Sequence, residues 1–278
     1  MRFETVHAAV GHVPYINATA ARHLYDLIGR HDCRRVLELG IAHGTSTCYI
    51  AAALASLLDD TGNVAEQPMV TAVDLIDVNF SPTAEQQLEQ TGLSSYAEVI
   101  RMRSGYNWFL HDQIAAQTSN DLCTPLYDLC IIDGPKNWTI DSSAFFLVDK
   151  LLRPGGWIIF DDYHWTYSHA SKKRDSTDGV THRELSTAEM TIPHIAEVFE
   201  LLVKQHSNYT DFVRWEDMNW AMARKRTEDE QPGGPPFQKR YTVRYDKTVA
   251  DPISRWFSQL SKRYRTKRHR RRAESEDR

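Results

Sequence analysis

The sequence lacks the features that mark secreted or membrane-embedded proteins. Its 278 residues include only four cysteines, and none of them forms a C-x-x-C pair. No apolar run approaches the roughly 18 residues that a membrane-spanning helix needs, and the N-terminus, Met1–Glu4, shows no signal-peptide pattern. We therefore expect reduced, mostly buried thiols, no membrane span and a cytoplasmic protein.

Positive charge is scarce in most of the chain and concentrated at its end. Residues 252–278 contain ten Lys/Arg and three Asp/Glu, a net charge of +7, so the other 251 residues carry −11 of the total of −4. A basic tail can contact nucleic-acid phosphates or an anionic membrane. The acidic body argues against a broad nucleic-acid footprint, so we expect no specific nucleic-acid function and at most a weak anionic-surface association of the tail.

The sequence also shows no internal repeats, and short apolar runs alternate instead with segments of helical periodicity. Runs rich in β-branched and aromatic residues, bounded by polar residues, Gly or Pro, are typical of buried parallel strands. The alternation predicts an α/β fold, a Rossmann-like doubly wound seven-stranded mostly parallel sheet that ends in an antiparallel hairpin at 211–215 and 219–223. The expected parallel strands are 35–40, 69–74, 97–102, 126–133 and 155–164, and the expected helices are 18–28, 45–58, 82–90, 106–116, 142–152 and 193–203.

Composition divides the chain into three parts. Residues 1–227 form the expected catalytic domain, in which the polar, aperiodic stretch 165–191 has the length of a lid or binding loop. Residues 228–251 include Gln231–Pro236, a Pro/Gly-rich linker signal. In residues 252–278 we expect one amphipathic helix followed by a disordered end.

The first strand-to-helix turn carries the run Val36–Ser46, which reads V-L-E-L-G-I-A-H-G-T-S. Glycines at 40 and 44 favour a tight turn and the close approach of a ligand, and the helix N-terminus that follows favours polar or anionic groups. The run is neither the G-x-G-x-x-G dinucleotide fingerprint nor a P-loop, because residue 42 is Ala and no lysine follows.

The spacing E-x-G-x-x-x-G after a first strand resembles motif I of the class I S-adenosylmethionine-dependent methyltransferases. The resemblance implies that Asp74, at the end of the second strand, holds the ribose hydroxyls of the cofactor, for which a carboxylate is a suitable acceptor. Ser104, after the third strand, matches a position near the adenine. The cofactor-binding residues implied in this way are Glu38, Gly40, Ala42, Gly44, Ser46, Asp74, Ser104 and Asp133.

Three aspartates fall at the ends of two further strands of the expected sheet. Asp133 ends the run that begins at Leu126, and Asp161 and Asp162 end the run that begins at Gly155. In open parallel sheets, ligands bind outside the carboxyl ends of the strands, so these carboxylates should converge at one edge. Such a cluster suits a hard cation, and Mg²⁺ is the expected ion.

The sequence Asp133-Gly134-Pro135-Lys136, followed by the pair Asp161-Asp162, sharpens the resemblance. It is similar to the cation-dependent O-methyltransferases of the catechol, caffeoyl-CoA and macrolide-sugar types over residues 10–225. The resemblance implies that the three aspartates hold Mg²⁺ and that Lys136 is the catalytic general base. The Asp-Asp form, followed by Tyr163, is closer to the sugar-modifying branch.

The chemistry of Lys136 leaves the identity of the base open. A lysine must be neutral to accept a proton; burial and a metal lower its pKa, whereas three carboxylates raise it. An aspartate or His164 is an alternative base. Trp138 and Trp165 flank the site, where they either line the substrate pocket or pack in the core.

We therefore expect an S-adenosylmethionine-dependent, Mg²⁺-dependent methyltransferase that methylates a hydroxyl of a small acceptor, such as a sugar, a polyketide or a phenol. A metal makes such a hydroxyl more acidic, and positioning against the sulfonium methyl supplies much of the rate. Alternatives on the same scaffold are N-methylation and hydroxylase-like chemistry. A different alternative is a protein that binds nucleic acid or associates with a membrane through its basic tail. Relatives of this type often dimerise, so a homodimer is a further expectation.

Overall fold

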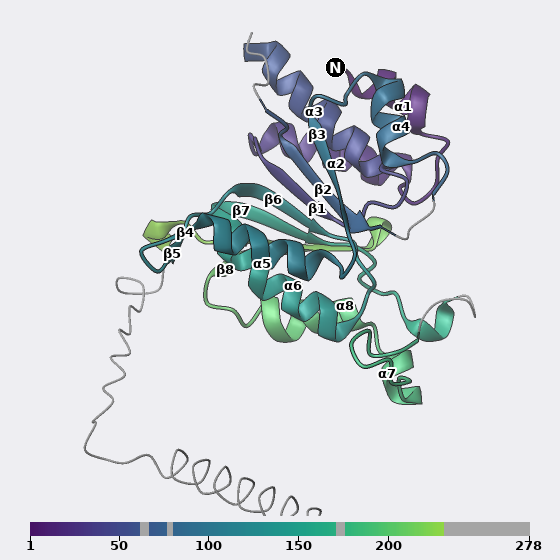
Figure 1. Ribbon diagram of the computed structural model, residues 1–278, viewed down its shortest axis with the longest axis vertical. Helices are drawn as coiled ribbons and strands as arrows, with labels where there is room; N and C mark the ends of the chain where they lie inside the picture. Colours follow the sequence, from purple (N-terminus) through teal and green to yellow (C-terminus); the bar gives the residue numbers. More distant parts are fainter. Residues whose placement is uncertain (62–66, 77–79, 171–175, 231–278) are drawn as a thin grey trace, which may run out of the picture. The chain divides into compact units, whose positions relative to one another are not determined.

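The computed structural model describes residues 1–61, 67–76, 80–170 and 176–230 (Figure 1). Contacts divide the chain into two units, Met1–Pro232 and Gly233–Arg278, and all described residues belong to the first unit. The Pro/Gly-rich run at 231–236, the amphipathic helix expected within 252–278 and the disordered end therefore lie outside the described residues.

The first unit is built on a seven-stranded sheet with the spatial order β3-β2-β1-β6-β7-β9-β8. Its first five strands are parallel, whereas β9 runs antiparallel to β7, and β8 runs antiparallel to β9. The predicted fold class, with its C-terminal hairpin, is therefore confirmed. The strands of this sheet are β1 (Val36–Leu39), β2 (Val70–Leu75), β3 (Ala97–Met102), β6 (Tyr127–Ile132), β7 (Leu152–Phe160), β8 (Tyr209–Trp215) and β9 (Trp220–Lys225).

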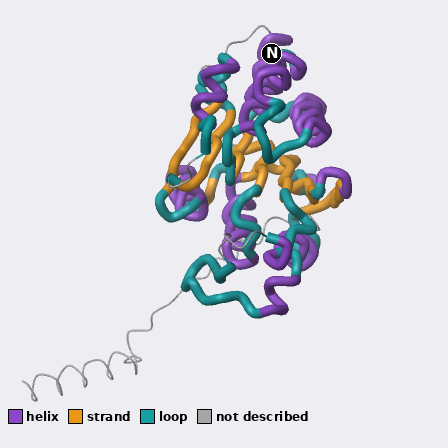
Figure 2. Tube along the Cα trace, turned by 90° about the vertical axis from the view of Figure 1, so that its right-hand side faces the viewer, coloured by secondary structure: helices purple, strands orange, loops and turns teal. Residues whose placement is uncertain are grey.

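Helices cover both faces of the sheet, and Figure 2 shows the strands with helices on either side. Helices α1 to α4 pack together over one face, and α5, α6, α8 and the π-helical turn η2 pack over the other. The helices are α1 (Phe3–Val10), α2 (Ala18–Arg30), α3 (Thr45–Thr61), α4 (Ala84–Thr91), α5 (Tyr106–Gln117), α6 (Trp138–Leu151), α7 (Thr187–Thr191), α8 (His194–Glu197) and η2 (Val198–Val203).

The continuous apolar runs of the central strands follow from this layering. Along β6, Leu129 and Ile131 contribute to the core under α1 to α4, while Cys130 and Ile132 contribute to the core under α5 and α6. Successive side chains of a strand point to opposite faces, so a strand covered on both sides is apolar at every position. This explains why no polar alternation interrupts the run.

Capping residues account for where two helices begin. The Asn17 side chain accepts a hydrogen bond from the Ala20 amide and caps α2, as predicted. Helix α6 begins at Trp138, four residues before the predicted start at Ser142, because Asn137 caps it by accepting from the amides of Thr139 and Ile140. A single side chain with two backbone donors thus outweighs the weak apolar periodicity of the first helical turn.

Several elements differ from the sequence-based expectation. Helix α1 and the two-stranded ribbon of β4 (Thr118–Ser119) and β5 (Leu122–Cys123) were not predicted. The stretch 165–191 contains a 3₁₀ turn at Tyr167–His169, a bridge between Thr177 and Glu184, and helix α7. The predicted helix 193–203 is divided into α8 and η2.

The state of the cysteines agrees with the expected reduced, mostly buried thiols. All four cysteines are free, and Cys33, Cys48 and Cys130 are buried. Burial raises the pKa of the Cys33 thiol to about 12, which keeps it protonated. Among the described residues, no helix is both long and apolar enough to cross a membrane.

The parallel strands bring the predicted site residues to one edge of the sheet. Because β3, β2, β1, β6 and β7 lie side by side in this order, their carboxyl ends form a continuous rim. The chain winds away from β1 in one direction and from β6 in the other, which makes the gap between them a topological switch point. Spatially, the rim reads Ser104, Asp74, Gly40, Asp133 and Asp161.

Candidate functional site

The three predicted metal ligands meet at the carboxyl ends of β6 and β7. Asp133 directly follows β6, and Asp161 and Asp162 directly follow β7. The two strand ends are held level, because Ile132 pairs with Phe160 and the Asp161 amide donates to the Ile132 carbonyl at 3.1 Å. One carboxylate oxygen from each aspartate lies within 4.8 Å of the other two.

The close approach of the three carboxylates disfavours their charged forms. Burial raises the pKa of Asp161 well above the ordinary aspartate value, and the neighbouring carboxylates of Asp133 and Asp162 raise it further. Burial also raises the pKa of Asp133, although the Lys136 ammonium opposes this shift. Three partly buried oxygen donors with this repulsion fit a hard divalent cation, which would neutralise them.

Lys136 provides the positive charge that the cluster faces in this structure. The residue is 6% exposed, and its Nζ is hydrogen-bonded to Asp133 Oδ1, with Asp133 O and Asp162 Oδ2 each at 3.3 Å. Burial by itself lowers the pKa of Lys136, but the charges of Asp133, Asp162 and Asp161 outweigh it and raise that pKa above the ordinary lysine value. In this arrangement Lys136 is therefore an ammonium group with three acceptors.

A buried hydrogen-bond network supports the loop that carries Lys136, and sequence reasoning missed it. The Tyr106 hydroxyl, at the start of α5, donates to Asp141 of α6, and Asp141 accepts from the Asn137 amide at 2.6 Å. A side chain at Gly134 would collide with the Tyr106 hydroxyl. Asp141 and Asn137 are both buried, so this network fixes the backbone immediately after the first metal-ligand candidate.

The glycine loop has the tight conformation that its sequence predicted. Gly40, Ala42 and Gly44 all have positive φ angles, of 87°, 47° and 75°. A side chain at Gly40 would collide with the Asp133 carbonyl, and one at Gly44 would collide with Ala84 of α4. The small residues therefore allow close packing against β6 and α4, so at Gly40 and Gly44 the space next to Cα is taken by the protein's own chain.

Asp74 and Glu38 both hold this loop from below. Asp74 Oδ2 accepts hydrogen bonds from the amides of Ile41 and Ala42, at 3.0 and 2.9 Å. Glu38 is buried and accepts from the Thr47 hydroxyl at 2.6 Å, and burial raises the pKa of its carboxyl to about 7. Sequence reasoning assigned both residues to the cofactor and did not foresee that they bind the loop and helix α3 directly.

The remaining predicted cofactor residues, Ser46 and Ser104, lie in α3 and after β3. Ser46 is partly exposed in the first turn of α3, and hydrogen bonding to it lowers the pKa of Glu38 against the larger effect of burial. Ser104 is exposed just after β3, at the far end of the rim from the aspartates.

The alternative base His164 is occupied by a different partner. Its Nε2 lies 2.8 Å from Glu216 Oε2, and its side chain is half exposed. Its amide donates to Asn219 Oδ1 at 2.8 Å, and the Asn219 side chain also reaches Asp162 Oδ1 at 3.4 Å. The turn between β8 and β9 is therefore fastened to the strand end that carries the aspartates, a contact that the sequence did not reveal.

The two tryptophans proposed to flank the site lie on the stretch 165–191 and on α6. Trp165 packs edge-on against Tyr167, with ring centroids 4.8 Å apart. Trp138 is 37% exposed and lines a groove of about 280 Å³ between α6, α7 and α8. His194 is shared by these elements, because its Nδ1 accepts from the Trp138 amide and its Nε2 bonds the Glu189 carbonyl.

Comparison with known proteins agrees with the resemblance. Residues 37–163 match the family model described as a methyltransferase domain, a span that includes the glycine loop, Asp74 and all three aspartates. No curated protein sequence matches the chain significantly. Residues 37–163 are therefore similar to a methyltransferase domain, in agreement with the resemblance of the motifs.

Solved structures share the fold at low sequence identity. An O-methyltransferase from Bacillus cereus in complex with SAH is 18% identical, with a TM-score of 0.54, and covers 81% of this chain and 92% of its own. The O-methyltransferase TomG from Streptomyces achromogenes, involved in tomaymycin synthesis and in complex with SAM, is 18% identical with a TM-score of 0.52. The match covers 81% of this chain and 91% of TomG. The SAH-bound methyltransferase PaMTH1 from Podospora anserina is 12% identical with a TM-score of 0.54. The match covers 80% of this chain and 86% of PaMTH1. At these identities the likeness establishes the fold.

Proposed function

We propose that this chain, whose residues 37–163 match the model of a methyltransferase domain, is an S-adenosylmethionine- and Mg²⁺-dependent O-methyltransferase that acts on a hydroxyl of a small molecule. The observation that carries the proposal is the cluster of Asp133, Asp161 and Asp162 on the same rim as the glycine loop. The fold alone supports methyl transfer in general, and the carboxylate cluster favours the cation-dependent form.

S-adenosylmethionine is the proposed cofactor because the glycine loop and the acidic residue after it have the motif I order. Gly40, Ala42 and Gly44 would shape the loop around the methionine part, and Asp74 would meet the ribose. The carboxylate of Asp74 has lone pairs left after it accepts from the loop amides, so it can both fasten the loop and accept from hydroxyls. The SAM and SAH complexes of proteins with this fold support this assignment.

The proposed metal residues are Asp133, Asp161 and Asp162. When bound, the cofactor supplies the methyl group, and Mg²⁺ supplies a Lewis acid for the acceptor hydroxyl. The aspartates would orient the acceptor through that ion, and Tyr106 and Asp141 hold the Asp133 loop in place. The proposed acceptor is therefore a hydroxyl compound small enough to reach the rim.

Lys136 is the proposed base, with one condition that its contacts impose. It must lose a proton before it can accept one, and the three carboxylates oppose that loss by raising its pKa. Neutralisation of the carboxylates by a divalent cation would remove this opposition. His164 is a weaker candidate, because Glu216 holds its Nε2.

The sequence left other functions and properties open besides O-methylation. N-methylation or hydroxylase-like chemistry on this fold has no observation in its favour beyond the shared scaffold. A nucleic-acid or membrane role would depend on residues 252–278. Cytoplasmic location and a homodimer stay expectations, supported respectively by the free cysteines and by nothing further.

The test is methyl transfer from radiolabelled S-adenosylmethionine to a panel of catechols, phenols, sugars and nucleosides, each paired with an amine of similar shape. We expect transfer to one hydroxyl class in Mg²⁺, and its loss in EDTA and in Asp161→Ala. Transfer that is unchanged by EDTA, or that favours the amines, would contradict the proposal and support N-methylation.

A further inference from the structure

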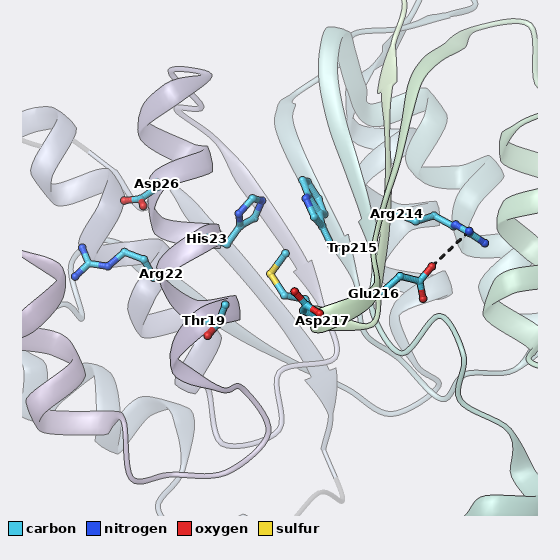
Figure 3. A pocket seen from close by; sticks show the side chains of 9 residues that line it. Thr19, Arg22, His23, Asp26, Arg214, Trp215, Glu216 and Asp217 are labelled. Atoms are coloured by element: carbon cyan, nitrogen blue, oxygen red, sulfur yellow. Dashed lines mark ion pairs between the residues drawn. The ribbon is translucent and has the colours of Figure 1, made fainter.

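Some buried polar atoms have no hydrogen-bond partner within the described part of the chain, and two of them lie in contrasting surroundings. His23 Nε2 is buried where its ring faces Trp215, beside a groove between α2 and the turn that joins β8 to β9 (Figure 3). The residues that line this groove belong neither to the glycine loop nor to the aspartate cluster. Gln87 Oε1, by contrast, belongs to a side chain that is bonded to the glycine loop. Gln87 is therefore the buried polar group that adjoins the proposed site.

Gln87 occupies a core-facing position of α4. Ala84, Gln87 and Leu88 are the buried residues of this helix, and their spacing of three and four residues places them on one face. Gln87 is 1% exposed, so it takes a place that an apolar side chain would normally fill. Burial of an amide whose oxygen has no donor is unfavourable for stability. A residue that breaks the local rule in this way points to a use other than packing.

The amide nitrogen of Gln87 holds the end of the glycine loop. Its Nε2 donates to the His43 carbonyl at 2.5 Å and to Thr45 Oγ1 at 3.3 Å. Because a carbonyl can only accept, the nitrogen must face it, and this leaves the amide oxygen on the side without a donor. His43 lies between Ala42 and Gly44, both of which have positive φ angles, and Thr45 is the first residue of α3. One amide group thus spans the point where the loop becomes a helix.

Two further contacts fasten α4 and the segment before it to the same part of the loop. His43 Nδ1 lies 2.8 Å from the Pro82 carbonyl. A side chain at Gly44 would collide with Ala84, so the two backbones are in close contact. The carboxylate of Asp74 holds the preceding part of the loop through its amides. The first half of the loop is therefore held by β2 and the second half by α4.

The loop needs such support because its conformation is unfavourable for a free chain. Gly40, Ala42 and Gly44 all have positive φ angles. Glycine adopts many other conformations equally well, and alanine disfavours this one. A loop that populated other conformations would bind a ligand with an affinity reduced by the fraction of competent loop. A donor that fixes the His43 carbonyl before the ligand arrives raises that fraction.

We infer that Gln87 is a positioning residue, which holds the glycine loop in its binding conformation through the His43 carbonyl. The inference rests on the proposed function, in which this loop binds S-adenosylmethionine. The N–H donor of Gln87 serves cofactor binding, whereas its buried amide oxygen does not serve stability. An apolar replacement should therefore separate cofactor affinity from stability, which a purely structural role would not do.

The main variant is Gln87→Met, which keeps the length of the side chain and removes the donor. The matched control is Gln90→Met, the same change at an exposed position of α4. We would measure S-adenosylmethionine binding by titration calorimetry and thermal unfolding on the full-length protein. We expect Gln87→Met to bind about fivefold to tenfold more weakly, with a Tm within about 3 °C of the wild type, and Gln90→Met to match the wild type in both. Equal affinities of the two variants, or weaker binding together with a fall in Tm beyond this range, would overturn the inference.

Gln87→Glu restores the donor only while the new carboxyl is protonated. Because burial raises the pKa of a carboxyl, the variant should present an O–H to the His43 carbonyl at about pH 5.5 and a repelling charge at about pH 8. Relative to the wild type, we expect nearly full cofactor affinity at the lower pH, where Gln87→Met stays weak, and a loss of about tenfold or more at the higher pH. The titratable groups His43, Glu85 and Glu89 are common to both proteins, so their effects cancel in this ratio. A ratio that did not change with pH would contradict the role of the donor.

Hydrogen exchange separates a failure of this inference from a failure of the proposed function. The amides of Ile41 and Ala42, which donate to Asp74, report on the loop without any ligand. By NMR they should exchange severalfold faster in Gln87→Met than in Gln90→Met, as expected for a loop that opens more often. A wild type that bound no S-adenosylmethionine would contradict the proposed function, whereas equal exchange in the two variants would overturn the positioning role of Gln87.

Discussion

The two halves of the rim use the same residue type in opposite ways. At the glycine-loop end, the carboxylates of Glu38 and Asp74 are bound by neutral donors of the loop and of α3. At the aspartate end, Asp133, Asp161 and Asp162 face each other, and a single ammonium opposes them. In the first arrangement the carboxylates hold the glycine loop and α3 in place. In the second arrangement the negative charges lie close together.

The difference shows that the role of a carboxylate at a strand end depends on the hydrogen-bond donors and charges around it. A carboxylate whose lone pairs are filled by amides and hydroxyls is a structural group. Carboxylates that crowd one another repel, even where single oxygens accept from an amide as those of Asp161 and Asp162 do, and they favour any cation that can reach them. The comparison predicts that changes at the aspartate end respond to metal, and that changes at the glycine-loop end respond to cofactor or to pH.

The largest effect is expected for Lys136→Met. Removal of the buried ammonium leaves the partly buried carboxylates uncompensated, a loss of roughly 3 kcal/mol in the free energy of unfolding without metal. Mg²⁺ should restore more of this stability in the variant than it adds to the wild type, because the ammonium no longer competes for Asp133 and Asp162. The measurement is thermal unfolding with EDTA and with Mg²⁺.

The matched control for that variant is Lys225→Met. Lys225 is also largely buried and donates to the Leu152 carbonyl at 3.0 Å, but it lies at the other end of β9. It should lose stability that Mg²⁺ does not restore. If Mg²⁺ stabilised both variants equally, the effect of Mg²⁺ would not be specific to the aspartate cluster.

The second effect concerns pH and the glycine-loop end. Burial raises the pKa of Glu38 from 4.5 to about 7 in the folded state, so between these values the folded chain holds a proton that the unfolded chain has lost. Stability from this group is therefore present below about pH 4.5 and declines as pH rises to 7, by roughly 3 kcal/mol in total.

Glu38→Gln should remove this decline, because a neutral amide cannot titrate. Urea unfolding of the wild type and of the variant between pH 4.5 and 7.5 gives the two slopes. Glu98→Gln, an exposed change on β3, which is separated from β1 by β2, is the control and should keep the wild-type slope. Parallel slopes for wild type and Glu38→Gln would show that the buried carboxyl does not carry the effect.

The third effect is expected for Asp74→Ala. The loop amides of Ile41 and Ala42 lose a charged acceptor, which should cost about 1.5–3 kcal/mol of stability and weaken S-adenosylmethionine roughly tenfold or more, with Mg²⁺ binding unchanged. Asp128→Ala is a close match, because Asp128 accepts from the Arg34 and Arg35 amides at the opposite edge of the sheet.

The pair separates a loop-shaping role from a general loss of stability. Calorimetric titration with S-adenosylmethionine should show weak binding by Asp74→Ala and normal binding by Asp128→Ala. If both variants bound the cofactor equally well, the glycine loop would not be the cofactor site.

The smallest effect is expected for Tyr106→Phe. Loss of the hydroxyl removes one donor from buried Asp141 and loosens the packing on Gly134, at a cost of about 1–2 kcal/mol. Because the Asp133 loop rests on this network, Mg²⁺ affinity should fall severalfold. Tyr127→Phe removes a hydroxyl that donates to Thr71, at 3.4 Å, and should leave Mg²⁺ affinity unchanged. Titration calorimetry compares the two variants.

The fold and the convergence of the aspartates were predictable because both follow from local rules. Apolar runs that alternate with helices specify a parallel sheet, and parallel strands bring their carboxyl ends to one edge. Asp133, Asp161 and Asp162 therefore had to meet once the strands were identified. The position of Lys136 near Asp133 follows from their spacing of three residues, whereas its role as base was implied by the resemblance.

The missed contacts share a physical cause. Asp74 and the amides of Ile41 and Ala42 are more than thirty residues apart, as are Tyr106 and Asp141. Their meeting depends on the packing of separate elements, and nothing in the spacing of either residue signals its partner. The resemblance to methyltransferases supplied a cofactor role for Asp74 and gave no hint that the same carboxylate closes the loop.

The central claim is that Asp133, Asp161 and Asp162 form a divalent-cation site, and Mn²⁺ is its most direct probe, since it suits oxygen ligands and is visible by electron paramagnetic resonance. We would titrate Mn²⁺ into the wild type and Asp161→Ala and measure the free ion. We expect one Mn²⁺ bound per wild-type chain, its displacement by Mg²⁺, and its loss in the variant. Absence of binding by the wild type, or equal binding by Asp161→Ala, would contradict the claim.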